Sequence, residues 1–262
     1  MKSILVPTDF SDTASNAAHY AAAFCKEHGL QMYVMHAMHV PLVDANAPIT
    51  LAETMMDNER KFTQIKLDKL AEELTEKYGI NIKTESDFGL GSDVIIETAE
   101  TLNAEAIVMG TSGESGLLAS LLGSVTAAVA KRSDVPVIAV PKNAKYRAFK
   151  NVVFGNDNKE PIAKELATIH EFFKGSKTKL HIVSVQGRIG DYVQEVICDE
   201  GGVKEVAVWD SSVEEGLTEY LDKENADILA IKQHTRGFIE ELFHKSTTKE
   251  LLKDCSIPLF IF

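Results

Sequence analysis

The segment that decides the fold runs from Lys2 to Ala37 and reads KSILVPTDFSDTASNAAHYAAAFCKEHGLQMYVMHA. Lys2 to Val6 is a short apolar run with β-branched residues, which predicts a buried strand. Ser11 is a suitable N-cap for a helix that continues to Glu27. Gln31 to Ala37 predicts a second strand. This order of strand, helix and strand is typical of a parallel sheet with right-handed crossover helices.

The same alternation continues through the first half of the chain. After a loop from Pro41 to Thr50, we expect helices at 51–77, 92–102 and 117–131, and strands at 80–86, 106–109 and 135–140. Gly79 is placed to end the first of these helices. The pattern predicts a doubly wound α/β fold with five parallel strands in the order 3-2-1-4-5.

The pattern restarts after a short polar linker, Asn143 to Ala148. Strands are expected at 151–155, 179–185, 203–209, 227–231 and 257–262, with helices at 161–173, 192–199, 213–223 and 239–253. Residues repeat as well as pattern, since Asn103–Gly110 parallels Asn225–Lys232. We therefore predict two domains, 1–143 and 149–262, each with a five-stranded parallel sheet. The alternative is a single domain of nine or ten strands that only looks repetitive.

Composition excludes some classes of function. The 262 residues carry 39 acidic and 27 basic side chains, a net charge of −12. An acidic surface disfavours nucleic acid as a partner. No apolar run is long enough to span a membrane, so no membrane association is expected. The three cysteines are scattered, which favours a reducing compartment and predicts a cytoplasmic protein.

One segment carries most of the chemical signal, because glycines cluster where a buried strand passes into a helix. It starts at Gly110 and reads GTSGESGLLASLLGSV. Glycines let phosphates approach the backbone closely enough to receive several N–H hydrogen bonds. Ligands of open α/β sheets bind beyond the carboxyl ends of the strands, so Pro7 to Asp9 should face the same crevice.

Two rival phosphate-binding motifs do not fit. The sequence has no GxxxxGK[ST], which disfavours a P-loop nucleotidase. The glycines Gly110, Gly113 and Gly116 are spaced GxxGxxG, whereas a dinucleotide fingerprint is GxGxxG. Such a fingerprint would also require an acidic residue at the end of the second strand, where His36 and Ala37 stand instead.

The set of motifs resembles the universal stress protein family in its tandem form. The pattern G-x2-G-x9-G-[ST], the ATP-binding signature of that family, is matched without gaps by Gly110, Gly113, Gly123 and Ser124. The opening Ile4 to Ser11 is similar to the first strand of that family and its aspartate. The resemblance covers the whole first half and, more weakly, the second.

The resemblance implies a role for each matching residue. Pro7, Asp9 and the backbone of Ala37 would contact the adenine and ribose, and Met109 and Gly110 would pass along the ribose. The phosphates would be held by the remaining matched positions, Gly113, Gly123, Ser124 and Val125. ATP is the implied ligand, together with Mg²⁺.

The second half departs from this signature. When Ser246 is aligned with Ser124, the positions of the three glycines are taken by Lys232, Thr235 and Lys245. Each substitution adds a side chain where phosphates would lie, so we predict no ATP site in this half. The resemblance further suggests that 135–140 and 257–262 pair antiparallel, which would make the chain an intramolecular pseudo-dimer. Further homodimerisation is left open.

Other candidates are weaker. His36 and His39 form an HxxH pair that is better interpreted as structural or pocket-lining than as a metal site. A zinc site at His234, His244 and Cys255 is disfavoured by the wide spacing. No nucleophile with an adjacent base stands out, so no catalytic residue is predicted.

The leading hypothesis is regulatory ATP binding in a stress response, with an unknown protein partner. One alternative is an enzyme of the adenine nucleotide α-hydrolase-like group, either adenylate-forming or slowly ATP-hydrolysing. An adenylate-forming enzyme would need a glycine-rich loop after the first strand, and the residues from Phe10 onward lack it. The other alternative is a scaffold that binds no nucleotide.

Overall fold

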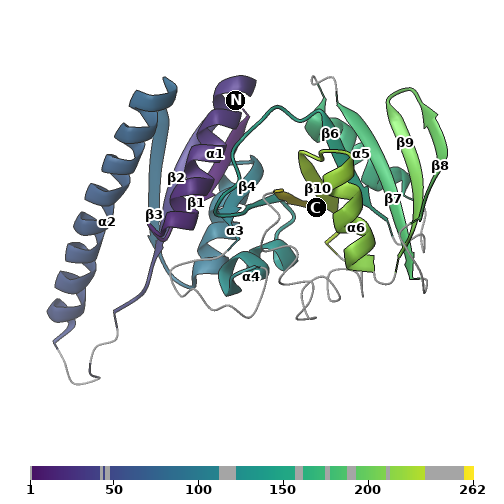
Figure 1. The fold of residues 1–262 in the computed structure, drawn as a ribbon. Coiled ribbons are helices and arrows are strands. Elements are labelled where there is room, and N and C mark those ends of the chain that lie inside the picture. The colour runs from purple at the N-terminus through teal and green to yellow at the C-terminus, as the bar shows by residue number, and fades with distance from the viewer. Residues whose placement is uncertain are drawn as a thin grey trace.

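The chain folds as one sheet between two layers of helices (Figure 1). The computed structural model describes residues 2–41, 44, 48–111, 122–156, 162–174, 178–187, 193–210, 213–233 and 257–262. The sheet has eleven strands in the order β3-β2-β1-β4-β5-β11-β10-β6-β7-β9-β8. Strands of the first half of the chain therefore occupy one side of the sheet, and strands of the second half occupy the other.

The strands of the first half run parallel in the order β3-β2-β1-β4-β5. This order confirms the predicted α/β fold class for this half. The strands are β1 (Ser3–Pro7), β2 (Gln31–Met38), β3 (Ile82–Phe88), β4 (Ala104–Gly110) and β5 (Val137–Val140).

The helices described between these strands are α1 (Asp12–His28), α2 (Ile49–Tyr78), α3 (Gly91–Thr101) and α4 (Ser124–Arg132). Ser11 caps α1 as predicted, because its hydroxyl accepts a hydrogen bond from the amide of Ala14 at 3.2 Å. Gly79 ends α2 in the left-handed conformation, also as predicted. Residues 117–121 of the helix predicted at 117–131 lie outside the described residues.

The second half repeats this order as β9-β7-β6-β10-β11. Asn103 and Asn225, at corresponding turns before β4 and β10, both have positive φ, 47° and 50°. The predicted helix at 239–253 lies outside the described residues. The elements are β6 (Asn151–Gly155), α5 (Ala163–Phe173), β7 (Lys179–Gly187), β9 (Val203–Asp210), α6 (Val213–Lys223), β10 (Ile228–Ile231) and β11 (Leu259–Ile261).

The predicted helix from Tyr192 to Asp199 is wrong. Val193 to Glu200 forms a strand, β8, which pairs antiparallel with β9 and ends the sheet. Gly201 and Gly202, both with positive φ, connect the two strands in a two-residue hairpin turn. The second half therefore has an additional antiparallel strand instead of only five parallel ones.

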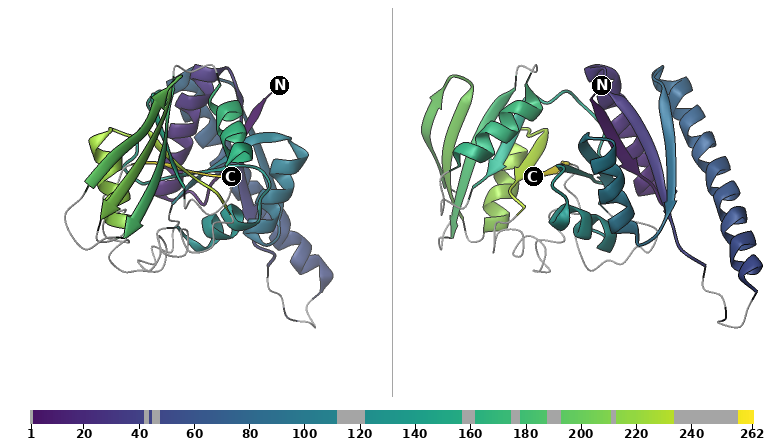
Figure 2. Two further views of the ribbon diagram at one scale, coloured as in Figure 1. Left: turned by 90° about the vertical axis from the view of Figure 1, so that its right-hand side faces the viewer. Right: turned by 180° about the vertical axis from the view of Figure 1, so that it is seen from behind.

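The two faces of the sheet carry separate hydrophobic cores. One core joins β1, β4, β6 and β10 to α1, α2 and α5, and the other joins the opposite face to α3, α4 and α6. Figure 2 shows these layers from the β8 edge and from behind. No helix in the described part of the chain is long and apolar enough to cross a bilayer.

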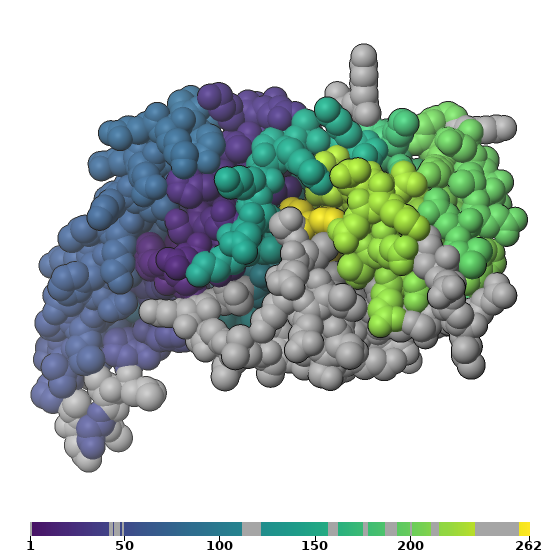
Figure 3. All heavy atoms as spheres, viewed as in Figure 1, coloured from purple at the N-terminus to yellow at the C-terminus, as the bar shows by residue number. Residues whose placement is uncertain are grey.

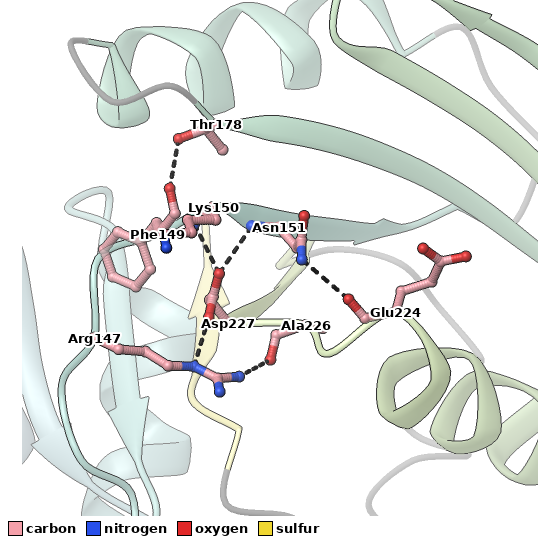
Figure 4. Close-up of polar contacts among 8 residues, drawn as sticks. All are labelled: Arg147, Phe149, Lys150, Asn151, Thr178, Glu224, Ala226 and Asp227. Atoms are coloured by element: carbon pink, nitrogen blue, oxygen red, sulfur yellow. Dashed lines mark hydrogen bonds and ion pairs between the residues drawn. The ribbon is translucent and has the colours of Figure 1, made fainter.

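The two halves meet through β5 and β11, which pair antiparallel as predicted. The connector to the second half is also anchored, because Oδ2 of Asp227 accepts hydrogen bonds from the amides of Lys150 and Asn151 at 2.7 and 2.8 Å (Figure 4). Arg147 pairs with the same carboxylate and donates to the carbonyl of Ala226 at 2.6 Å. The division into domains at 143 and 149 stays a prediction.

Candidate functional site

The carboxyl ends of β1, β2 and β4 and the first turn of α4 surround one cleft of about 980 Å³. This is the crevice where ligands of open α/β sheets bind. All the predicted site residues in the described part of the chain line it, namely Pro7, Asp9, Ala37, Met109, Gly110, Gly123, Ser124 and Val125. Gly113, the remaining predicted residue, lies outside the described residues.

Backbone hydrogen bonds hold the turn after β1 against the end of β2. The amide of Thr8 donates to the carbonyl of Met35 at 2.8 Å, and Nδ1 of His36 donates to the carbonyl of Thr8 at 2.6 Å. That contact orients the imidazole, which lines the cleft as predicted. His39 lines the cleft too, yet no cluster of three or more metal-ligating side chains occurs among the described residues.

Asp9 belongs to a tight turn at the start of α1. Its Oδ1 accepts a hydrogen bond from the amide of Ser11 at 3.0 Å. Phe10, between them, has a φ of 64°, which is uncommon for a residue with a bulky side chain. Its ring lies 4.9 Å from that of His36. The turn therefore sets the position of Asp9 at the cleft through contacts within the chain.

Gly110, at the end of β4, is required by packing within the chain. A Cβ at this position would lie 2.8 Å from Cγ2 of Thr13 and 3.1 Å from the Thr13 backbone carbonyl. Glycine therefore lets β4 approach α1 closely. The Gly110 carbonyl also accepts a hydrogen bond from the Thr126 hydroxyl at 2.9 Å, which ties α4 to the strand end.

The first turn of α4 presents backbone N–H groups to the cleft. Gly123 is its N-cap and has no side chain with which to cap the helix, and Ser124 and Val125 are exposed. The first N–H groups of a helix have no partner within the helix, and its dipole favours negative charge there. This turn can therefore hold an anion without a cationic side chain.

A second helix start reaches the same cleft. Gly91 and Ser92, at the start of α3, line it, and the N-cap residue Leu90 makes no side-chain cap hydrogen bond. Two helix N-termini without side-chain caps thus contribute positive potential to one cleft. The sequence predicted a helix here without assigning it to the site.

One wall of the cleft comes from α2, which the sequence predicted as a helix without assigning it to the site. Glu59, Phe62, Thr63 and Lys66 line this wall. The Lys66 ammonium lies 5.1 Å from the centre of the Phe10 ring, within reach of a cation–π interaction. No motif in the sequence marks these residues, because only the packing of α2 brings them to the cleft.

In the first half of the chain, β4 ends in a glycine. At the corresponding position of the second half there is an ion pair. Lys232, aligned with Gly110, has its ammonium 2.8 Å from Oε1 of Glu165 in α5. Glu165 is buried, and its hydrogen bond with Lys232 lowers the pKa of this carboxyl below its ordinary value. The predicted departures at Thr235 and Lys245, with Ser246, and the zinc candidates His234, His244 and Cys255 lie outside the described residues.

A family model and several known proteins match this chain. The model of the universal stress protein family matches residues 1–141. Universal stress protein MJ0531 of Methanocaldococcus jannaschii is 37% identical over 147 residues, 55% of this chain and 84% of that protein.

Two matches extend over the second half as well. Universal stress protein Slr1230 of Synechocystis is 25% identical over a 297-residue alignment that covers all of both chains. A solved universal stress protein from Archaeoglobus fulgidus matches 99% of this chain and 95% of that chain, with a TM-score of 0.63 and 20% identity. At that identity the second match shows a shared fold.

Proposed function

Because the chain belongs to the universal stress protein family, we propose that its first half binds ATP in the cleft at the ends of β1, β2 and β4. The observation that carries the proposal is the meeting of both ends of the glycine signature at this cleft. Gly110 ends β4 and Gly123 precedes the first residue of α4, and both line the cleft. A cleft of about 980 Å³ is within the size range of small-molecule sites.

The triphosphate lies against the first turn of α4 in this proposal. The backbone N–H groups of Ser124 and Val125 donate to phosphate oxygens, and the Ser124 hydroxyl adds a further donor. The N–H of Gly123 donates to the carbonyl of Thr111, and this glycine contributes by letting the phosphates approach the backbone. Gly113, which lies outside the described residues, would add a backbone contact, as the resemblance to the family implies. The lack of a side-chain cap at Gly123 supports this assignment, because the helix start is left to a ligand or to water.

The nucleoside lies between the ends of β1, β2 and β4. Ala37 and Met109 provide apolar surface for the adenine, and Pro7 with Asp9 faces the ribose. A carboxylate is a suitable acceptor for ribose hydroxyls. The fit is supported by the position of Asp9, whose side chain is held by the Ser11 amide.

Mg²⁺ accompanies the triphosphate in this proposal. Such an ion usually keeps several waters and takes one or two carboxylates in addition to phosphate oxygens. Asp9 and Glu59 are the acidic side chains that line the cleft among the described residues. The ion would neutralise phosphate charge in a site that offers Lys66 as its nearby ammonium.

We propose no ATP site in the second half and a regulatory role for the first. The Lys232–Glu165 ion pair lies where a nucleotide would need open backbone. Nucleotide occupancy of the first half then biases a conformation that a protein partner reads. The role is binding rather than turnover, and a reaction that consumed ATP at a catalytic rate would favour the enzyme alternative instead.

Calorimetry of ATP binding to the full chain tests the assignment. Gly123→Val should lower the affinity at least about tenfold, because a branched side chain would stand beside the phosphates and about 1.4 kcal/mol corresponds to a factor of ten. Ala127→Val, at an exposed position one turn further along α4, should bind as the unmutated protein does. Equal affinities for all three proteins would refute the phosphate site.

A further inference from the structure

The inner face of α2 buries a stripe of side chains that is apolar except at the cleft. α2 lies along one end of the molecule (Figure 3), so this stripe is its contact with the rest of the chain. Its polar member, Thr63, is 3% exposed and lines the cleft, whereas the others do not. The stripe consists of Thr63, Leu67, Ala71 and Leu74.

The fold makes no use of the Thr63 hydroxyl. This hydroxyl forms no hydrogen bond with any described residue. The hydroxyls of Thr8, Ser92 and Thr126, which also line the cleft, each hydrogen-bond to another part of the chain. A buried hydroxyl without a partner costs free energy, and a valine would fill nearly the same space without that cost. Packing therefore does not explain the hydroxyl, whereas a ligand in the cleft would.

Aromatic rings line the same end of the cleft. Phe10, His36 and Phe62 all contribute to its wall, and the rings of Phe10 and His36 lie 4.9 Å apart. Lys66, which follows Thr63 by one turn of α2, has its ammonium 5.1 Å from the centre of the Phe10 ring. Small-molecule sites combine apolar and aromatic walls with a few placed polar groups, and nucleobases stack on aromatic rings. This end of the cleft is therefore suited to a base.

α2 and the start of α4 lie at opposite ends of the cleft. α2 packs against β2 and β3, whereas α4 packs against β5. In the strand order of the sheet these strands are on the two sides of β1 (Figure 1). The two helices also belong to the cores on opposite faces of the sheet. A nucleotide whose phosphates lie at α4 therefore extends its base toward α2.

We propose that the Thr63 hydroxyl hydrogen-bonds the base of the bound nucleotide, an inference that rests on nucleotide binding in this cleft. A hydroxyl can both donate and accept a hydrogen bond. One edge of adenine presents an amino donor beside a ring-nitrogen acceptor, so the hydroxyl can pair with either group. Thr63 contacts neither the ribose nor the phosphates in this arrangement. Loss of the hydroxyl should therefore weaken the binding only of ligands that carry a base.

Calorimetry of the full chain with ATP and with ribose 5-triphosphate, which lacks the base, tests this contact. Thr63→Val should weaken ATP binding by about three- to tenfold, the loss expected for one hydrogen bond between uncharged groups. The same variant should bind ribose 5-triphosphate as the unmutated protein does. Thr63→Ser keeps the hydroxyl and should bind ATP within about twofold of the unmutated protein. Gly123→Val, at the phosphate end, should weaken the binding of both ligands.

Thr54→Val makes the same change at an exposed position of α2 outside the cleft and is the matched control. In urea unfolding without nucleotide, Thr63→Val should be at least as stable as the unmutated protein, because it removes an unpaired buried hydroxyl. An unmutated protein that binds neither ligand would overturn the ATP site and this inference together. If Gly123→Val weakens ATP binding but Thr63→Val does not, or if Thr63→Val weakens both ligands equally, only the contact with the base is refuted.

Discussion

Gly110 illustrates how one residue of a ligand motif can be required for packing. The resemblance to the family assigned Gly110 to the nucleotide site, where it would pass along the ribose. At Gly110, however, the space that a Cβ would need is taken by Thr13 of α1, including its backbone. At one end of the glycine signature, Gly110 packs against the chain itself. At the other end, Gly123 precedes a helix whose start faces the cleft.

Gly110→Ala should therefore destabilise the protein whether or not nucleotide is present. The added Cβ meets backbone that cannot rotate away, and overpacking of this kind costs about 1–3 kcal/mol. Urea unfolding measures the loss. Gly91→Ala, whose Cβ would have only ordinary contacts at 3.8 Å or more, is the control. A variant as stable as the unmutated protein would show that β4 and α1 are less closely packed than the structure has them.

Individual site residues were predictable only where a motif contained them. Asp9 and Gly123 belong to stretches that resemble the family, and both line the cleft. Phe62 and Lys66 line it as well, but they lie in the middle of a long amphipathic helix. Their place depends on how α2 packs against β2 and β3, which no local pattern in the sequence encodes.

Among the elements, β8 was mistaken for a helix although the local signal was present. Gly201-Gly202 separates two runs that are rich in valine, a strong indication of a hairpin. The expectation that each parallel strand is followed by a helix outweighed it. By contrast, the antiparallel pairing of β5 and β11 was predicted, because the family resemblance implies it and two apolar strands left open at sheet edges would invite aggregation.

The contact between β7 and α6 buries a histidine. His181 is 3% exposed, its Nδ1 lies 2.8 Å from the Tyr220 hydroxyl, and its Nε2 has no hydrogen-bond partner among the described residues. Burial lowers the pKa of His181 below its ordinary value, against the opposing effect of Glu224. Lys204, which pairs with Glu224 at 2.7 Å, lowers the pKa further.

The buried histidine should make the protein less stable in acid. Below about pH 6.5 the unfolded chain takes up a proton at this residue while the folded chain does not, so stability falls as the pH drops. Urea unfolding measures the decrease in the free energy of unfolding between pH 7.5 and pH 5.5. This decrease should be about 1 kcal/mol smaller in His181→Gln than in the unmutated protein. His170→Gln, at an exposed position, is the control variant. Equal losses in all three proteins would contradict the burial of His181.

At the scale of the whole molecule, the two halves of the chain share one strand order but differ at the ends of the corresponding strands β4 and β10. The repeated strand order, the paired turns at Asn103 and Asn225, and the β5–β11 seam are shared features. The strand ends differ, since Gly110 faces an open cleft and Lys232 is paired with Glu165. The repeat and the loss of glycines were readable from the sequence, whereas the ion pair required the structure.

An NMR titration of the full chain with Mg·ATP tests the central claim most directly, because it reports on both halves in one experiment. The account predicts that the backbone amides of Gly123, Ser124 and Val125 shift strongly and saturate together, while those around Lys232 and Glu165 stay unchanged. Shifts confined to the second half, or no shift at the start of α4, would contradict it.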